Sequence, residues 1–126
     1  MSAVFDTTVV TDYLRGAKQA ASAFKRFPHR AITVTTWVEV MAAAPPALAL
    51  ETREFLRTFE RLAISEAISD RALALIERHE GLSLRHAIPW ATAQINSSIY
   101  VSVDFPRLTE ENSTVYVPYR SRSARV

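Results

Sequence analysis

Short runs of β-branched and other apolar residues alternate along this chain with longer segments in which apolar residues recur every three or four positions. The short runs predict strands at residues 3–6, 31–35, 62–64, 99–103 and 114–117. The longer segments predict helices at residues 7–15, 17–27, 36–44, 47–62, 66–79 and 84–95. Strands that are separated by helices need crossover connections. The pattern therefore predicts an α/β fold, a single-domain three-layer α/β/α sandwich with a parallel sheet of about five strands.

The composition narrows the class of protein further. The chain has 126 residues, of which 48% are hydrophobic, and this suits one compact domain. We place that domain at residues 1–119 and a basic C-terminal tail at 120–126. With no Cys and only two Gly, the chain offers no thiolate metal site and no glycine-rich nucleotide loop. Its apolar stretches are too short for a membrane span, so we expect a cytoplasmic protein without a membrane partner.

Three acidic residues, Asp6, Glu39 and Asp104, each follow one of the predicted strands. The carboxyl ends of parallel strands lie along one edge of a sheet, so acids in these positions gather around one crevice. Clustered carboxylates repel one another, and a divalent cation is a common way to neutralise them. The pattern thus predicts a metal site at this edge.

Each acid also has a plainer explanation. Asp6 has the position of a helix N-cap, Glu39 has capping-box spacing from Thr36, and Asp104 precedes Phe105-Pro106, as turn residues do. The basic residues form an early cluster and a C-terminal one, which suit either a phosphate backbone or solvated surfaces. Their members are Lys18, Lys25, Arg26 and Arg30, and Arg120, Arg122 and Arg125.

Five blocks of the sequence resemble PIN domains of the VapC toxin type, in the family's order and across almost the whole chain. The blocks are residues 5–16 (FDTTVVTDYLRG), 32–40 (ITVTTWVEV), 84–93 (LRHAIPWATA), 102–104 (SVD) and 115–119 (VYVPY). The resemblance implies a PIN-like fold and an Mg²⁺- or Mn²⁺-dependent endoribonuclease that cuts RNA. It also implies a cognate antitoxin, which lays a segment across an apolar groove and places a cation among the carboxylates, and a homodimer.

The resemblance also assigns roles to individual residues. Asp6, Glu39 and Asp104 are implied as catalytic metal ligands, either directly or through water, and Ser102 as the residue that orients a ligand or the attacking water. The third block departs from the family, because its usual Leu-Pro-Asp-Ala is Leu-Arg-His-Ala here, with Arg85 and His86. His86 is a further candidate ligand. An imidazole suits Mn²⁺ or Zn²⁺ better than Mg²⁺, and we expect a lower metal affinity.

Three functions therefore stay open. The first is a metal-dependent ribonuclease with an altered metal preference. The second is a catalytically degraded PIN module that acts only by binding protein or RNA. The third is a phosphatase-like α/β enzyme with Asp6 as nucleophile, which is disfavoured because such enzymes need an acid two residues later, where Thr8 stands.

Overall fold

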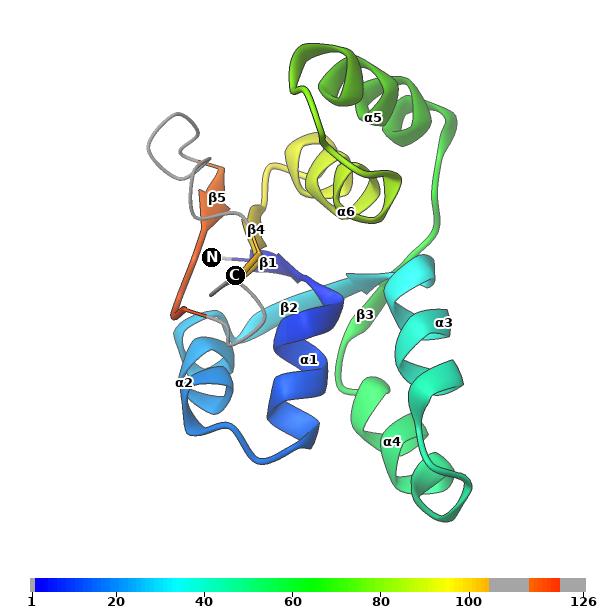
Figure 1. The fold of residues 1–126 in the computed structure, drawn as a ribbon, viewed down its shortest axis with the longest axis vertical. Helices are drawn as coiled ribbons and strands as arrows, with labels where there is room; N and C mark the ends of the chain where they lie inside the picture. Colours follow the sequence, from blue (N-terminus) through cyan, green and yellow to red (C-terminus); the bar gives the residue numbers. More distant parts are fainter. Residues whose placement is uncertain (1, 105–113, 121–126) are drawn as a thin grey trace.

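A sheet of five parallel strands forms the centre of the computed structural model, which describes residues 2–104 and 114–120 (Figure 1). The strands are β1 (Ser2–Phe5), β2 (His29–Thr33), β3 (Glu60–Leu62), β4 (Ile99–Val101) and β5 (Val115–Tyr116). Their order across the sheet is β3-β2-β1-β4-β5, and every neighbouring pair is parallel. The predicted parallel sheet of about five strands is confirmed.

Helices cover both faces of this sheet. They are α1 (Thr7–Leu14), α2 (Lys18–Arg26), α3 (Val34–Ala43), the 3₁₀ segment η1 (Pro46–Leu48), α4 (Ala49–Leu56), α5 (Glu66–Arg78) and α6 (Leu84–Ile95). α1 to α4 lie on one face, and α5 and α6 on the other (Figure 1). The three-layer α/β/α sandwich is thus also confirmed. In the described residues, none of these helices has the length and apolarity to cross a lipid bilayer.

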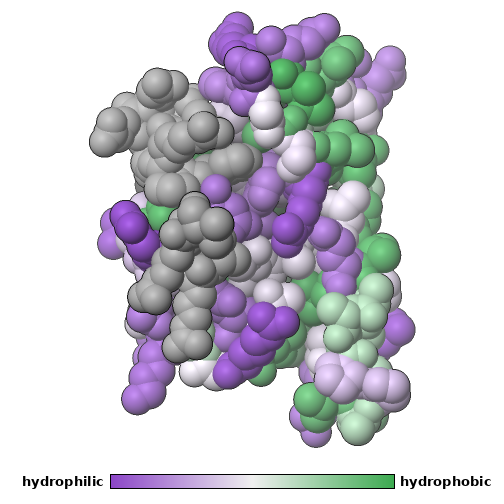
Figure 2. All heavy atoms as spheres, viewed as in Figure 1, coloured by the Kyte–Doolittle hydropathy of each residue, from purple (hydrophilic) through white to green (hydrophobic). Residues whose placement is uncertain are grey.

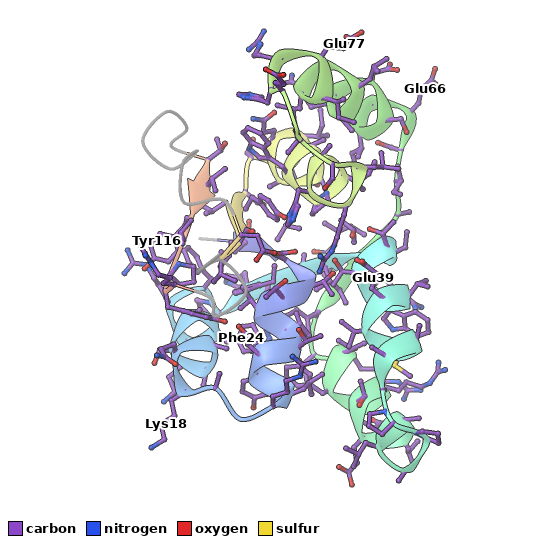
Figure 3. The ribbon with its side chains drawn as sticks, in the orientation of Figure 1. Lys18, Phe24, Glu39, Glu66, Glu77 and Tyr116 are labelled. Atoms are coloured by element: carbon purple, nitrogen blue, oxygen red, sulfur yellow. The ribbon has the colours of Figure 1, made fainter. Side chains whose placement is uncertain are left out.

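Alternation along β1 divides the core between the two layers. Ala3 and Phe5 point toward α1 to α4, while Val4 points toward α5 and α6. The first layer is rich in aromatic rings, and the ring centroids of Phe5 and Phe24 are 4.8 Å apart. Figure 3 shows Phe24 between α1 and α2. In the second layer, α6 buries His86 and Thr92 among its apolar residues.

Part of the early basic cluster packs on this aromatic core. The Arg30 guanidinium lies 4.8 Å from the Phe59 ring centroid, and the Arg26 guanidinium lies 4.8 Å from that of Tyr116. Such contacts are cation–π interactions, which join the charged groups to the hydrophobic core. The second basic cluster lies, apart from Arg120, outside the described residues.

The prediction of one long helix at 47–62 is wrong. The structure has η1, then α4 ending at Leu56, and then strand β3 at Glu60–Leu62. Phe59 between them is buried, and Leu62 pairs with Thr33 of β2. The apolar spacing that predicted one continuous helix therefore arises from a short helix and a strand that both face the core, because pairing with β2 outweighs local periodicity.

The capping-box interpretation of Glu39 is also wrong. The N-cap of α3 is Thr33, whose side-chain oxygen accepts a hydrogen bond from the Thr36 backbone N–H. α3 begins two residues earlier than expected, so Glu39 lies inside the helix, more than a turn from its start. Its side chain is consequently available for contacts with other elements.

Candidate metal centre at the carboxyl edge of the sheet

The order of the strands creates a crevice beside β1. The chain leaves β1 toward β2 and β3 on one side, then returns to place β4 and β5 on the other. A parallel sheet whose connections change direction in this way opens a crevice at the carboxyl ends of the strands, where ligands bind. Asp6 follows β1 directly, and Ser102 follows β4 directly. Figure 2 shows hydrophilic side chains gathered between α6 and the layer below it, around this edge.

Asp6 is the most deeply buried acid of this edge, with 1% of its surface exposed. It stands at the N-cap position of α1, but its carboxylate makes no capping hydrogen bond to the described amides of that helix. Instead its Oδ2 accepts from the Ser102 hydroxyl at 3.0 Å. Burial, and after it the charge of Asp104, raises the pKa of Asp6 to about 7, although the hydrogen bond from Ser102 opposes the rise. A bound cation would favour the ionised form of this carboxyl.

Asp104 lies across the crevice from Asp6 and shares Ser102 with it. The Ser102 hydroxyl, which donates to Asp6, also accepts from the Asp104 backbone N–H at 3.3 Å. The Asp104 Oδ2 accepts a hydrogen bond from the Thr8 hydroxyl at 2.9 Å. These contacts fix the ends of β1 and β4 relative to one another and hold two carboxylates at the same place.

His86 adds an imidazole from the first turn of α6. Its Nε2 lies 3.7 Å from Asp104 Oδ2, and its Nδ1 lies 4.0 Å from Asp6 Oδ1. The same Nδ1 is 2.9 Å from the hydroxyl of Tyr100. Burial lowers the pKa of His86 below its usual value, while the charges of Asp104 and Glu39 oppose this shift. In the neutral tautomer with the proton on Nδ1, the ring donates to Tyr100 and turns the Nε2 lone pair toward Asp104.

Asp6, His86 and Asp104 together fit a divalent cation. Each offers one ligand atom, and these atoms all lie within 4.8 Å of one another. Ligands on one ion at about 2.0–2.2 Å are roughly 3 to 4.4 Å apart, so a small inward movement would complete such a site. Two carboxylates and one imidazole are donors that Mn²⁺ and Zn²⁺ both accept, while Mg²⁺ prefers oxygen alone. We refer to these three residues as the inner group.

Glu39 lies outside the inner group. Its Oε1 accepts from the Thr7 hydroxyl at 2.8 Å, and its Oε2 lies 3.2 Å from the Nε of Arg85. Figure 3 shows Glu39 between α1 and α3, below α6. The sequence placed this acid at the correct edge of the sheet, and the structure holds it at the rim in an ion pair. We refer to Arg85 and Glu39 as the rim pair.

The sequence analysis gave no role to two residues of this edge, Tyr100 and Arg85. Tyr100 is fully buried on β4, two positions before Ser102. Residues two apart along a strand share a face, so the predicted strand at 99–103 was a signal that Tyr100 and Ser102 point to the same side. Arg85 was visible only as a departure from a family pattern. Its contact with Glu39 joins α6 and α3, which lie on opposite faces of the sheet, across the carboxyl edge.

Asp12 and the two tryptophans lie outside the inner group. Asp12 Oδ2 accepts a hydrogen bond from the Tyr119 hydroxyl at 2.8 Å, which ties the described end of the chain to α1. Trp90 is a core residue, and its Nε1 donates to the Thr114 hydroxyl at 3.1 Å. Trp37 is half-buried between the guanidinium groups of Arg53 and Arg61.

The fold and this edge define a PIN-type α/β domain, and solved structures agree. A toxin-antitoxin complex from Klebsiella pneumoniae is 32% identical with a TM-score of 0.87, and the match covers 94% of this chain and 99% of that chain. FitAcB from Neisseria gonorrhoeae is 16% identical with a TM-score of 0.75, covering 92% of this chain and 97% of that chain. VapBC2 from Rickettsia felis, bound to a DNA fragment from its promoter, is 10% identical with a TM-score of 0.72, covering 91% and 96%.

The last two similarities show the fold alone, whereas the first, at 32% identity over nearly the whole chain, shows the family. No family model matches the chain, and no curated protein does. This chain belongs to the VapC-type PIN-domain family of toxin-antitoxin proteins.

Proposed function

We propose that this chain is the toxin component of a VapBC-type pair and a metal-dependent endoribonuclease, which hydrolyses RNA phosphodiester bonds with a carboxylate-bound Mg²⁺ or Mn²⁺. The observation that supports this most is the convergence of Asp6, His86 and Asp104 within 4.8 Å at the crevice of a PIN-type sheet. The donor set fits a divalent ion, and the imidazole favours Mn²⁺ of the two. An RNA substrate suits a cytoplasmic protein.

Each residue of the edge has a distinct task in this proposal. A bound divalent ion would supply an activated water and stabilise charge on the phosphoryl oxygens. Asp6 and Asp104 would hold it through oxygen and His86 through Nε2. Ser102 keeps the Asp6 carboxylate in place by its hydrogen bond of 3.0 Å. Glu39, at the rim, would assist through a water molecule rather than by direct contact.

The proposed protein partner is an antitoxin, and a groove beside the site suits a segment of it. The groove has a volume of about 520 Å³ and lies between α1, α3 and α4, with Tyr13, Val40 and Phe55 in its wall. Val40 in its wall is the residue that follows Glu39 on α3. A cation on a segment lying in this groove could reach the carboxylates, as the family resemblance implies.

We also propose a homodimer. Val38 on α3, Leu73 on α5 and Leu84 on α6 have 57%, 58% and 65% of their surfaces exposed. Large apolar side chains in such numbers suit a second copy of the chain, which would remove them from water.

A binding-only PIN module is the second candidate, and one observation favours it. The chain neutralises its own acidic edge, because Arg85 pairs with Glu39 and His86 stands where the family has an acid. A module of this kind needs no metal to keep its fold and could act through its partner surfaces alone.

The two candidates differ in metal binding and RNA cleavage. We expect calorimetric titration of the metal-free protein with MnCl₂ to show binding, and a fluorescent single-stranded RNA to be cut only when Mn²⁺ is present. Asp6→Asn should reduce cleavage by at least about 100-fold, because it removes the most buried charged ligand. Asp12→Asn, the same change farther along α1, is the matched control and should cleave at the wild-type rate.

RNA that stays intact at millimolar Mn²⁺, with no heat of binding, would favour the binding-only module. His86→Asp then provides the decisive comparison. If it restores cleavage, the rest of the site is competent, and the imidazole alone accounts for the lost activity.

A further inference from the structure

Arg85 is the residue of the edge that the proposed reaction leaves without a role. It lies in the first turn of α6, and its guanidinium reaches two other helices. Its Nε is 3.2 Å from Glu39 Oε2 on α3, and its Nη2 is 3.4 Å from the Thr8 hydroxyl on α1. Thr8 in turn donates to Asp104 Oδ2 at 2.9 Å. One hydroxyl group therefore separates the guanidinium from the inner group.

The rim pair is exposed to solvent, unlike the inner group. The side chains of Arg85 and Glu39 are 45% and 39% exposed. Ion pairs in such surroundings are weak, since water and salt screen them and two long side chains must be held in one geometry. Another anion of suitable shape can therefore displace Glu39 from Arg85.

A phosphodiester has that shape. Its two non-bridging oxygens match the planar fork of a guanidinium, which binds phosphate in a bidentate manner. RNA also faces repulsion at this edge, because Asp6, Glu39 and Asp104 are all acids. A positive charge placed at the rim, one hydroxyl from the inner group, would offset that repulsion where the phosphate must arrive.

We propose that Arg85 is a substrate-binding residue whose guanidinium exchanges Glu39 for a phosphate of the RNA. This inference rests on the proposed ribonuclease function and deepens it. In the free protein Glu39 holds the guanidinium in place above Thr8 and Asp104. With RNA bound, the same guanidinium contacts the phosphate beside the inner group. The replacement of the family's Pro-Asp by Arg85-His86 thus removes one negative charge and adds a phosphate ligand.

The test measures RNA binding separately from cleavage. Fluorescence anisotropy with a labelled single-stranded RNA of mixed sequence is recorded in EDTA, where metal-dependent cutting cannot occur, at several salt concentrations. We expect Arg85→Gln to lower the affinity about five- to tenfold and to reduce the slope of log K against log salt by about 0.7, the value for one phosphate contact on a single strand. Arg85→Lys should keep the slope and lose part of the cleavage rate in Mn²⁺, because an ammonium cannot grip two oxygens.

Arg57→Gln is the matched control. Arg57 forms a comparable exposed pair with Glu54 at 3.4 Å, but it lies just before β3, at the opposite edge of the sheet. This variant should bind and cleave RNA like the wild type. A second variant, Glu39→Gln, removes the competing anion and should raise RNA affinity, with a larger loss when Arg85→Gln is added to it.

Several outcomes separate this inference from the function on which it rests. If the wild type binds RNA but does not cut it, and Arg85→Gln still loses affinity and slope, Arg85 is a phosphate ligand and the nuclease proposal fails. Unchanged affinity and slope in folded Arg85→Gln would overturn the inference, and so would a wild type that does not bind RNA. Tighter binding or faster cleavage in Arg85→Gln would also overturn it, because Arg85 would then be an internal counter-ion of Glu39.

Discussion

The inner group and the rim pair lie at the same edge of one sheet, yet they obey different physics. The inner group is largely buried, with Asp6 at 1% exposure, and burial together with the neighbouring charges shifts the pKa values of Asp6 and His86. The rim pair is about two-fifths exposed and is joined by one contact of 3.2 Å. Electrostatic interactions are several times stronger in the protein interior than at the surface in contact with water. The buried charges of the inner group are therefore held in place, whereas the exposed charges of the rim pair can exchange partners.

Hydrogen-bond partners on the neighbouring strand and helices add to this difference between the inner group and the rim pair. Every buried side-chain nitrogen or oxygen that the structure describes has a hydrogen-bond partner. For the inner group these partners include Ser102, Thr8 and Tyr100, which restrict the orientation of the three ligands. We infer that the inner group is built for a ligand of fixed geometry, such as a metal ion, and that the rim suits a polymer that must enter and leave.

The largest effect expected from this comparison is a dependence of stability on pH that originates at Asp6. An unfolded Asp loses its proton near pH 3.8, whereas the folded Asp6 keeps it up to about pH 7. The folded state thus binds more protons in this window, so the Asp6 contribution to stability is fully present below pH 3.8 and is lost as the pH rises toward 7. The slope has an upper limit of about 1.4 kcal/mol per pH unit.

Urea unfolding of the metal-free protein in EDTA, from pH 4 to pH 8, measures this effect. The comparison with Asp6→Asn isolates the contribution of Asp6 from that of His86, whose lowered pKa acts in the opposite direction. The difference in unfolding free energy between wild type and variant should fall steadily up to pH 7. A difference that does not change with pH would mean that Asp6 is solvated. The inner group and the rim pair would then not differ in their exposure to water.

The sequence predicts more of the fold than of the site. The parallel sheet and the helix at Leu84–Ile95 follow from periodicity, because buried faces repeat whatever their partners are. The helix expected at 47–62 failed, since pairing between β2 and β3 is a contact between distant residues. The sequence could predict that Asp6, Asp104 and Glu39 lie at the carboxyl edge of the sheet. It could not predict that Glu39 lies at the rim of the site, because this too depends on a contact between distant residues. That position depends on Arg85, and no local pattern joins the two.

We expect a smaller effect, on metal affinity, from a change at Tyr100, whose hydroxyl contacts the His86 ring of the inner group. Removing its hydroxyl in Tyr100→Phe leaves His86 Nδ1 without the partner that lies 2.9 Å away. Groups that orient a metal-bound histidine contribute about 10- to 100-fold to metal affinity, and we expect a value near the lower end for Mn²⁺. Mg²⁺, which has little preference for the imidazole, should be affected less. Calorimetric titration with both ions measures the ratio.

Tyr116→Phe is the control for this variant, because Tyr116 is half-buried on β5 and packs against Phe27 and Arg26. It should leave the affinity for either ion unchanged. Equal losses of Mn²⁺ and Mg²⁺ affinity in Tyr100→Phe would contradict the assignment of His86 Nε2 as a ligand, since the hydroxyl would then act only through the fold.

The smallest effect is expected at the rim and is measured by a double-mutant cycle in urea unfolding. Arg85→Gln, Glu39→Gln and their combination should give a coupling energy below about 1 kcal/mol, as exposed ion pairs do. The same cycle on Arg57 and Glu54, a pair at 3.4 Å with side chains 70% and 58% exposed, provides the reference. If the two values agree, the rim pair is an ordinary surface pair and Arg85 can leave Glu39 for a phosphate at little cost. A coupling of about 2 kcal/mol or more would make the rim as rigid as the inner group, and the proposed exchange would then be too slow and too unfavourable to serve substrate binding.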